Sequence, residues 1–103
     1  MGKTLTEKIL SQKSGSDARP GNIVIAEVDL AFVQDATGPL TVRQFQTSGF
    51  KRLANPQRKA IFLDHAAPSP NRELSNDHSL LRDFARQTGC PIFDVGAGVC
   101  HQI

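Results

Sequence analysis

Two short, largely apolar runs in this sequence each lead to side chains suited to acid–base chemistry. Residues 61–63 are followed at once by Asp64 and His65, and residues 91–95 are followed by a glycine-containing turn and then His101. A continuous apolar run is typical of a strand that is buried on both faces of a parallel sheet. In open α/β sheets, ligands bind at the carboxyl ends of the strands. The first run therefore makes Asp64 and His65 site candidates, and the parallel placement of His101 adds it to them.

A histidine held near a carboxylate is a suitable proton donor at neutral pH. Neighbouring side chains on an extended backbone point to opposite sides, so Asp64 and His65 converge only if the chain turns where the strand ends. The alternative is that His65 is an ordinary polar residue at a strand terminus, and His101 by itself could also be structural. No nucleophile accompanies the pair, which disfavours a metal-independent hydrolase.

Three further polar residues are weaker candidates. Gln34 and Asp35 end the first predicted strand, where they could hold a carboxylate or hydroxyl group or simply form a turn. His78 lies early in a predicted helix among polar neighbours, and we expect it to face solvent.

The elements that must position these residues follow from periodicity and capping signals. We expect helices over residues 5–13, 39–48 and 72–88, and strands over residues 22–33, 61–63 and 92–95. Thr4 and Glu7 form a capping box, Asn71 caps the third helix, and Gly49 and Gly89 end the second and third. Leu5, Ile9 and Leu10 should dock the first helix onto the core. A strand, helix, strand order with short links predicts an α/β fold of three layers, with a mainly parallel sheet between helices on both faces.

Composition excludes several classes of protein. The chain has 103 residues, 12 Lys and Arg against 10 Asp and Glu, and neither Trp nor Tyr. It therefore lacks the basic stripe and stacking platform of a nucleic-acid-binding protein. No apolar segment suits a signal peptide or a membrane span, so a cytoplasmic location without a membrane partner is expected. Cys90 and Cys100 match no zinc or redox spacing, which predicts reduced thiols and no metal ligands.

Three segments resemble the motifs of one family in the same order and spacing. They are residues 33–37 (VQDAT), 62–65 (FLDH) and 96–103 (GAGVCHQI), and residues 4–10 and 39–42 are similar as well. Together they resemble the N-terminal portion of large subunits in the aconitase superfamily. The resemblance covers essentially the whole chain.

The resemblance implies a hydro-lyase, which removes water from a hydroxy di- or tricarboxylate and returns it at the neighbouring carbon. The likeness is greatest to enzymes that isomerise 2-isopropylmalate to 3-isopropylmalate in leucine biosynthesis, and homoaconitate hydro-lyases share the motifs. By motif, Gln34 resembles a ligand of the substrate carboxylate. Asp64 and His65 resemble the pair that assists the leaving hydroxyl, and His101 a second active-site imidazole. The implied partners are the remainder of the large subunit, a small subunit and a small hydroxy-dicarboxylate substrate.

The implied cofactor is a 4Fe–4S cluster, and here the sequence departs from the family. Family large subunits are several times longer, and their three cluster-binding cysteines lie downstream of the His-Gln-Ile motif. Two cysteines cannot hold a cubane that takes three or four thiolates. We therefore expect residues 1–103 to be a single incomplete α/β domain that is inactive by itself and carries no cluster. A non-catalytic stand-alone domain is the alternative.

Overall fold

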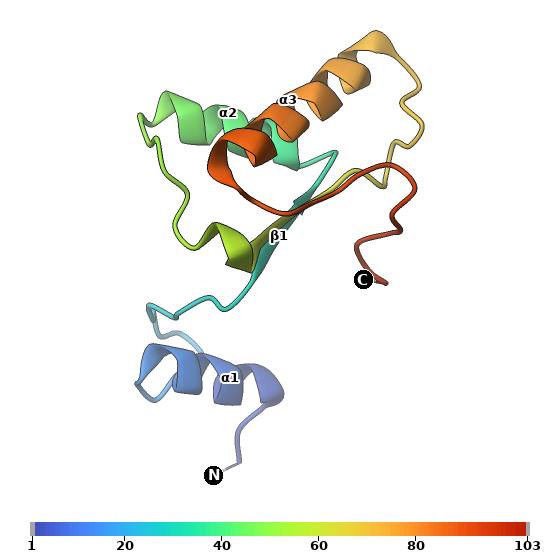
Figure 1. Ribbon diagram of the computed structural model, residues 1–103. Coiled ribbons are helices and arrows are strands. Elements are labelled where there is room, and N and C mark those ends of the chain that lie inside the picture. Colours follow the sequence, from blue (N-terminus) through green and yellow to red (C-terminus); the bar gives the residue numbers. More distant parts are fainter. Residues whose placement is uncertain (1, 103) are drawn as a thin grey trace.

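The computed structural model describes residues 2–102, in which a small sheet carries two helices and a third helix stands apart (Figure 1). The helices are α1 (Leu5–Ser14), α2 (Gly38–Thr47) and α3 (Arg72–Thr88), and the strands are β1 (Ala31–Gln34), β2 (Lys59–Phe62) and β3 (Ile92–Phe93). A 3-10 turn, η1 (Pro56–Arg58), leads directly into β2. Ile103, the last residue of the third motif, lies outside the described residues.

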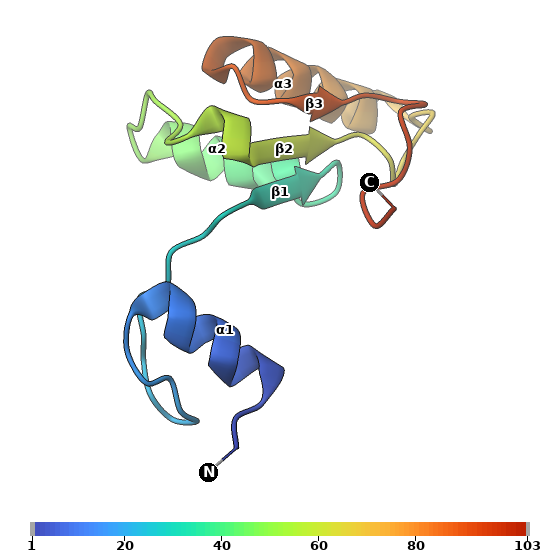
Figure 2. The same cartoon turned by 60° about the horizontal axis from the view of Figure 1, so that its bottom comes forward.

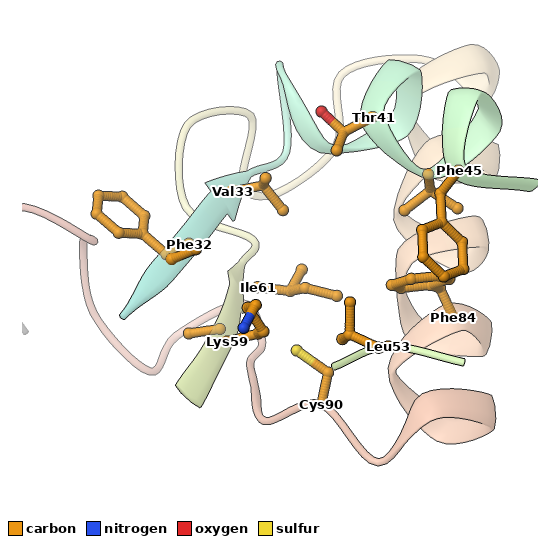
Figure 3. Close-up of a pocket in the computed structure, with 12 residues that line it drawn as sticks. Phe32, Val33, Thr41, Phe45, Leu53, Lys59, Ile61, Phe84 and Cys90 are labelled. Carbon is orange, nitrogen blue, oxygen red and sulfur yellow. The ribbon is translucent and has the colours of Figure 1, made fainter. Parts of the chain in front are cut away.

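The central strand β2 runs parallel to both of its neighbours, and the strand order is β1-β2-β3. Val33 pairs with Ile61, and Ile61 pairs with Ile92, so β-branched side chains line the middle of the sheet. The predicted α/β class with a parallel sheet is confirmed. Because parallel strands end at the same edge, the segments that follow β1, β2 and β3 leave the sheet on one side (Figure 2).

Helices α2 and α3 cover one face of the sheet (Figure 2). Their apolar residues pack on β2 and its continuation, where Leu63 and Leu81 are fully buried. Gly38 begins α2 where a side chain has no room, since a Cβ atom there would lie 2.9 Å from Leu81 Cδ2 and 3.2 Å from Val33 Cγ2. The buried members of this core are Val42, Ile61, Leu63, Leu81, Phe84, Ala85 and Cys90.

The opposite face of the sheet carries a second, smaller cluster. Ala60, Phe62 and Phe93 lie there with Cys100 against them, and the rings of Phe62 and Phe93 stack with their centroids 4.7 Å apart. No helix within residues 2–102 covers this face. The structure thus contains two of the three predicted layers, and the third stays a prediction.

The predicted strand over residues 22–33 was wrong for most of its length, because only Ala31–Gln34 is a strand. Ile23 and Ile25 are 99% and 92% exposed, so the apolar alternation there meets no sheet. The reason lies in the neighbouring strand. Since Ala31 pairs with Lys59, an extended β1 would face residues 56–58, which form η1 and offer no ladder.

Helix α1 has the predicted capping box but not the predicted docking. The Thr4 hydroxyl accepts a hydrogen bond from the Glu7 amide, while Leu5 and Ile9 are 73% and 48% exposed. Instead of packing on the core, α1 is tied to the segment that follows it. The ties are the Lys3–Asp17 ion pair, the Lys13–Asp29 ion pair at 2.6 Å, and the bond from the Ala18 amide to Ser11 Oγ at 2.9 Å.

The two helices on the sheet agree with their predicted bounds within a residue or two. Asn71 caps α3 by accepting from the Leu74 amide at 2.9 Å, and left-handed Gly89 ends it. Gly49, also left-handed, follows α2. Among the helices of residues 2–102, none has the length and apolar character that crossing a membrane requires.

Candidate functional site

The site candidates gather at the edge of the sheet where the strands end. Gln34 ends β1, Asp64 and His65 follow β2, and His101 lies in the segment after β3. The rings of His65 and His101 have their centroids 6.1 Å apart and meet at 66°. The structure therefore brings together the two imidazoles that the sequence placed after separate strands.

Asp64 and His65 converge, which adjacency alone did not establish. Asp64 Oδ1 lies 2.8 Å from His65 Nδ1, and Asp64 Oδ2 accepts a hydrogen bond from the Cys100 amide at 2.6 Å. The backbone turns at residues 65–66, shortly after β2 ends, which allows neighbouring side chains to meet. One carboxylate thus holds both the His65 ring and the chain that leads to His101.

The Asp64–His65 contact changes the pKa of both groups. For Asp64, burial acts to raise the pKa, but the hydrogen bonds from the Cys100 amide and the His65 ring outweigh it and bring the pKa to about 2. The hydrogen bond to Asp64 raises the pKa of His65 above its ordinary value, against the opposing effect of burial. The ionised Asp64 therefore favours the imidazolium form of His65, which is the form that donates a proton.

Asp35 is a functional candidate that the sequence left ambiguous. It is 1% exposed, and Oδ1 accepts from the His65 amide at 3.0 Å while Oδ2 accepts from the Ala66 amide at 2.7 Å. His78 Nε2 lies 3.2 Å from Oδ2. Burial acts to raise the pKa of Asp35, and these three donors lower it more, so the carboxylate form is favoured. Asp35 fixes the backbone turn that presents the His65 ring.

The expectation that His78 faces solvent was wrong, because His78 is 2% exposed and bonded to Asp35. The sequence held a signal for this. His78 precedes Leu81 by three residues and Ala85 by seven, so all three lie on the same face of α3, the one that packs on the sheet.

Gln34 and His101 reach the site but have fewer contacts. Gln34 Oε1 accepts from the Ala36 amide at 2.5 Å, so its carbonyl end folds back on its own turn. His101 is exposed beside His65. Their predicted roles toward a substrate stay predictions.

The cysteines do not fit an iron–sulfur cluster. Cys90 belongs to the core between the helices and the sheet, whereas Cys100 lies with Phe62 and Phe93 on the opposite face. The sheet separates the two thiols, and a 4Fe–4S cubane takes three or four thiolates around one centre. The cysteines of residues 2–102 therefore do not supply the thiolate set of such a cluster.

Replacing Asp64 with asparagine is expected to lower the pKa of His65. The substitution removes the negative charge that favours the imidazolium, so the titration midpoint of His65 should move to lower pH. An NMR titration of the His65 ring protons measures this. Asp83→Asn, which alters an exposed carboxylate on α3, is the matched control and should leave the midpoint in place. An unchanged midpoint in Asp64→Asn would show that the contact does not govern His65.

Comparison with known proteins shows strong similarity along the whole chain. It is 53% identical over 103 residues to the 3-isopropylmalate dehydratase large subunit of Elusimicrobium minutum, and 48% identical over 103 residues to large subunit 1 of that enzyme from Thermotoga maritima. It is also 40% identical over 110 residues to the homoaconitase large subunit of Thermus thermophilus. Each alignment includes all of this chain but only 24–25% of the relative. No protein-family model matches the chain.

The parallel α/β fold and these similarities relate the chain to large subunits of the aconitase family. Within that family it is similar to the N-terminal region of the large subunit of 3-isopropylmalate dehydratase. The chain spans about a quarter of the length of the curated relatives it matches. The resemblance predicted from the three motifs is confirmed.

Proposed function

We propose that this chain is the N-terminal part of a hydro-lyase large subunit that interconverts 2-isopropylmalate and 3-isopropylmalate by dehydration and rehydration, as in leucine biosynthesis. The observation that carries the proposal is the 2.8 Å contact between Asp64 Oδ1 and His65 Nδ1 at the carboxyl edge of the sheet. The similarity to 3-isopropylmalate dehydratase large subunits supports the choice of substrate. A cytoplasmic location remains part of the proposal.

In the proposed reaction His65 protonates the hydroxyl group as the carbon–oxygen bond breaks and water leaves. The proton lost from the neighbouring carbon, which lets the double bond form, goes to a base that the proposal places outside this chain. Hydroxide is a poor leaving group, so a positioned acid lowers the barrier for breaking the carbon–oxygen bond. The acid must carry the proton before it donates it, and the hydrogen bond to Asp64, which raises the pKa of His65, favours that charged form. In the rehydration half of the cycle the neutral imidazole takes a proton from the incoming water, since the same path is followed in reverse.

Two carboxylates prepare His65 for this role without touching the substrate. Asp64 favours the imidazolium form and fixes the ring through Nδ1, which leaves Nε2 as the donor. Asp35 holds the amides of His65 and Ala66 and so sets the turn. Both are positioning residues in this proposal, while Gln34 binds a substrate carboxylate and His101 is a second active-site imidazole.

The family relationship implies an iron–sulfur cluster, and the proposal assigns its thiolate ligands to residues outside this chain. A small subunit and the remainder of the large subunit are the proposed partners, as the name large subunit of the relatives suggests. The 103-residue chain by itself is then proposed to be inactive.

The test is an activity assay on a complete large subunit that contains residues 1–103. The subunit is reconstituted anaerobically with iron and sulfide, mixed with its small subunit, and supplied with 2-isopropylmalate. Formation of the unsaturated dehydration product, followed by ultraviolet absorbance, is the expected result. The 103-residue chain treated in the same way is the control and should show neither turnover nor the absorbance of a stable cluster. A reconstituted enzyme without turnover, or a cluster on the short chain, would contradict the proposal.

Homoaconitate is the second candidate substrate, favoured by the 40% identity to the homoaconitase large subunit of Thermus thermophilus. Measuring kcat/KM for both hydroxy acids on the same reconstituted enzyme separates the two. Preference for homoaconitate would replace the isopropylmalate proposal but keep the hydro-lyase class.

A further inference from the structure

A group of three side chains at the carboxyl edge offers nitrogen and sulfur ligands to a metal ion. One ligand atom from each of His65, Cys100 and His101 lies within 4.8 Å of the other two. Imidazole and thiolate are the ligands that Zn²⁺ takes in proteins, whereas Mg²⁺ and Ca²⁺ prefer oxygen. We propose that this chain binds one Zn²⁺ ion, or a divalent ion of similar preference, through His65, Cys100 and His101.

Two of the three ligands are held in place by a single carboxylate. Asp64 Oδ1 contacts His65 Nδ1, which leaves Nε2 of that ring for a metal, and Asp64 Oδ2 accepts from the Cys100 amide. A carboxylate behind a histidine is the usual outer support of a zinc ligand, because it fixes the ring and its tautomer. Asp64 therefore serves the proposed site as an orienting group and not as a ligand.

The arrangement suits an ion with three protein ligands and one water molecule. Cys100 is 8% exposed, whereas His65 and His101 are exposed, so one side of the group is open to solvent. In a tetrahedral zinc site the ligand atoms lie about 3.5 Å from one another. The present separations, all within 4.8 Å, are therefore not far from those of a bound ion, and His101, whose ring is exposed, is the ligand free to adjust.

A competing group at the same edge consists of Asp35, Asp64 and His65, whose ligand atoms also lie within 4.8 Å of one another. It is the weaker candidate because both carboxylate oxygens of Asp35 already accept hydrogen bonds within the protein. Its two oxygens accept from two amides and contact His78. A metal bound there would take the acceptor away from these buried donors. Each unsatisfied donor would cost about 1–3 kcal/mol of stability.

The cysteine spacing predicted no metal ligand, and the proposal departs from that prediction because its ligands come from two separate parts of the chain, one after β2 and one after β3. No short cysteine and histidine spacing exists to be recognised. The site does not depend on the proposed function. If His65 is a proton donor, zinc bound to its ring would block donation, and excess zinc would inhibit the enzyme.

The test is a titration of the full 103-residue chain with Zn²⁺ by calorimetry, in the presence of a reductant that does not bind metals. We expect saturation at one ion per chain and no binding of Mg²⁺. Loss of a supporting group such as Asp64 typically costs 10–100-fold in affinity, so Cys100→Ser and His101→Ala should each weaken binding by at least about tenfold. Cys90→Ala, which removes the thiol on the other side of the sheet, is the matched control and should keep the affinity.

A second measurement does not depend on how well the variants fold. Co²⁺ added to the unaltered chain should give the intense near-ultraviolet absorption of a cobalt–thiolate bond, and Zn²⁺ should displace it. Absence of that band, zinc affinity that survives Cys100→Ser, or equal losses in Cys90→Ala and Cys100→Ser would each overturn the proposal.

Discussion

Replacing His65 with alanine in the complete, reconstituted large subunit is expected to lower kcat for isopropylmalate dehydration by about 10²–10⁴-fold, the usual contribution of a positioned general acid. The expectation rests on the proposed role of His65 as the group that protonates the leaving hydroxyl. KM should change much less, because His65 acts on the bond that breaks and not on the carboxylates of the substrate. Steady-state kinetics with equal cluster content in each preparation measures the effect.

Two variants separate loss of the acid from loss of structure. His65→Gln keeps a polar side chain of similar reach but cannot donate a proton at neutral pH, so it should be nearly as slow as His65→Ala. Arg86→Ala alters an exposed ion pair with Asp83 on α3 and should retain full activity. Turnover of His65→Ala at more than about a tenth of the unaltered rate would remove His65 from the role of proton donor.

Replacing Asp35 with alanine is expected to destabilise the chain by about 3–5 kcal/mol, as removal of one partner from a buried charged network does. Two amides and the His78 ring lose their acceptor in a place where Asp35 is only 1% exposed. Small domains are stable by only about 5–15 kcal/mol, so the variant should unfold at much lower urea concentration or be partly unfolded without urea. Urea unfolding followed by circular dichroism measures the change.

Acid provides an independent check on Asp35. The pKa of Asp35 is lower in the folded chain than in the unfolded chain. Its contribution to the free energy of unfolding is therefore complete above the unfolded pKa and is lost as pH falls through the folded pKa. The stability difference between the unaltered chain and Asp35→Ala should therefore shrink in acid. Asp83→Ala removes an exposed carboxylate and should stay within about 0.5 kcal/mol of the unaltered chain. An Asp35→Ala variant as stable as Asp83→Ala would mean that the network does not hold the turn.

The sequence by itself determined the features that depend on neighbouring residues. The side chains of Thr4 and Asn71 cap their helices, and Gly49 and Gly89 follow the helix ends in left-handed conformations. The apolar run at residues 61–63 predicted the central strand, because a continuous apolar run indicates burial whichever strands lie beside it. Motif order and spacing predicted the resemblance to aconitase-family large subunits without any structure.

The tertiary structure decided which polar groups meet. Asp35 reaches the His65 amide across 30 residues and His78 across 43, and Asp64 reaches the Cys100 amide across 36. No local pattern encodes such contacts, because they depend on the parallel register of β1, β2 and β3. The same dependence explains why the strand predicted over residues 22–33 does not form at residues 22–30. The alternating pattern there has no partner strand. His65 was thus identified as a candidate from sequence, but its fixed ring and its neighbour His101 follow from the register of the sheet.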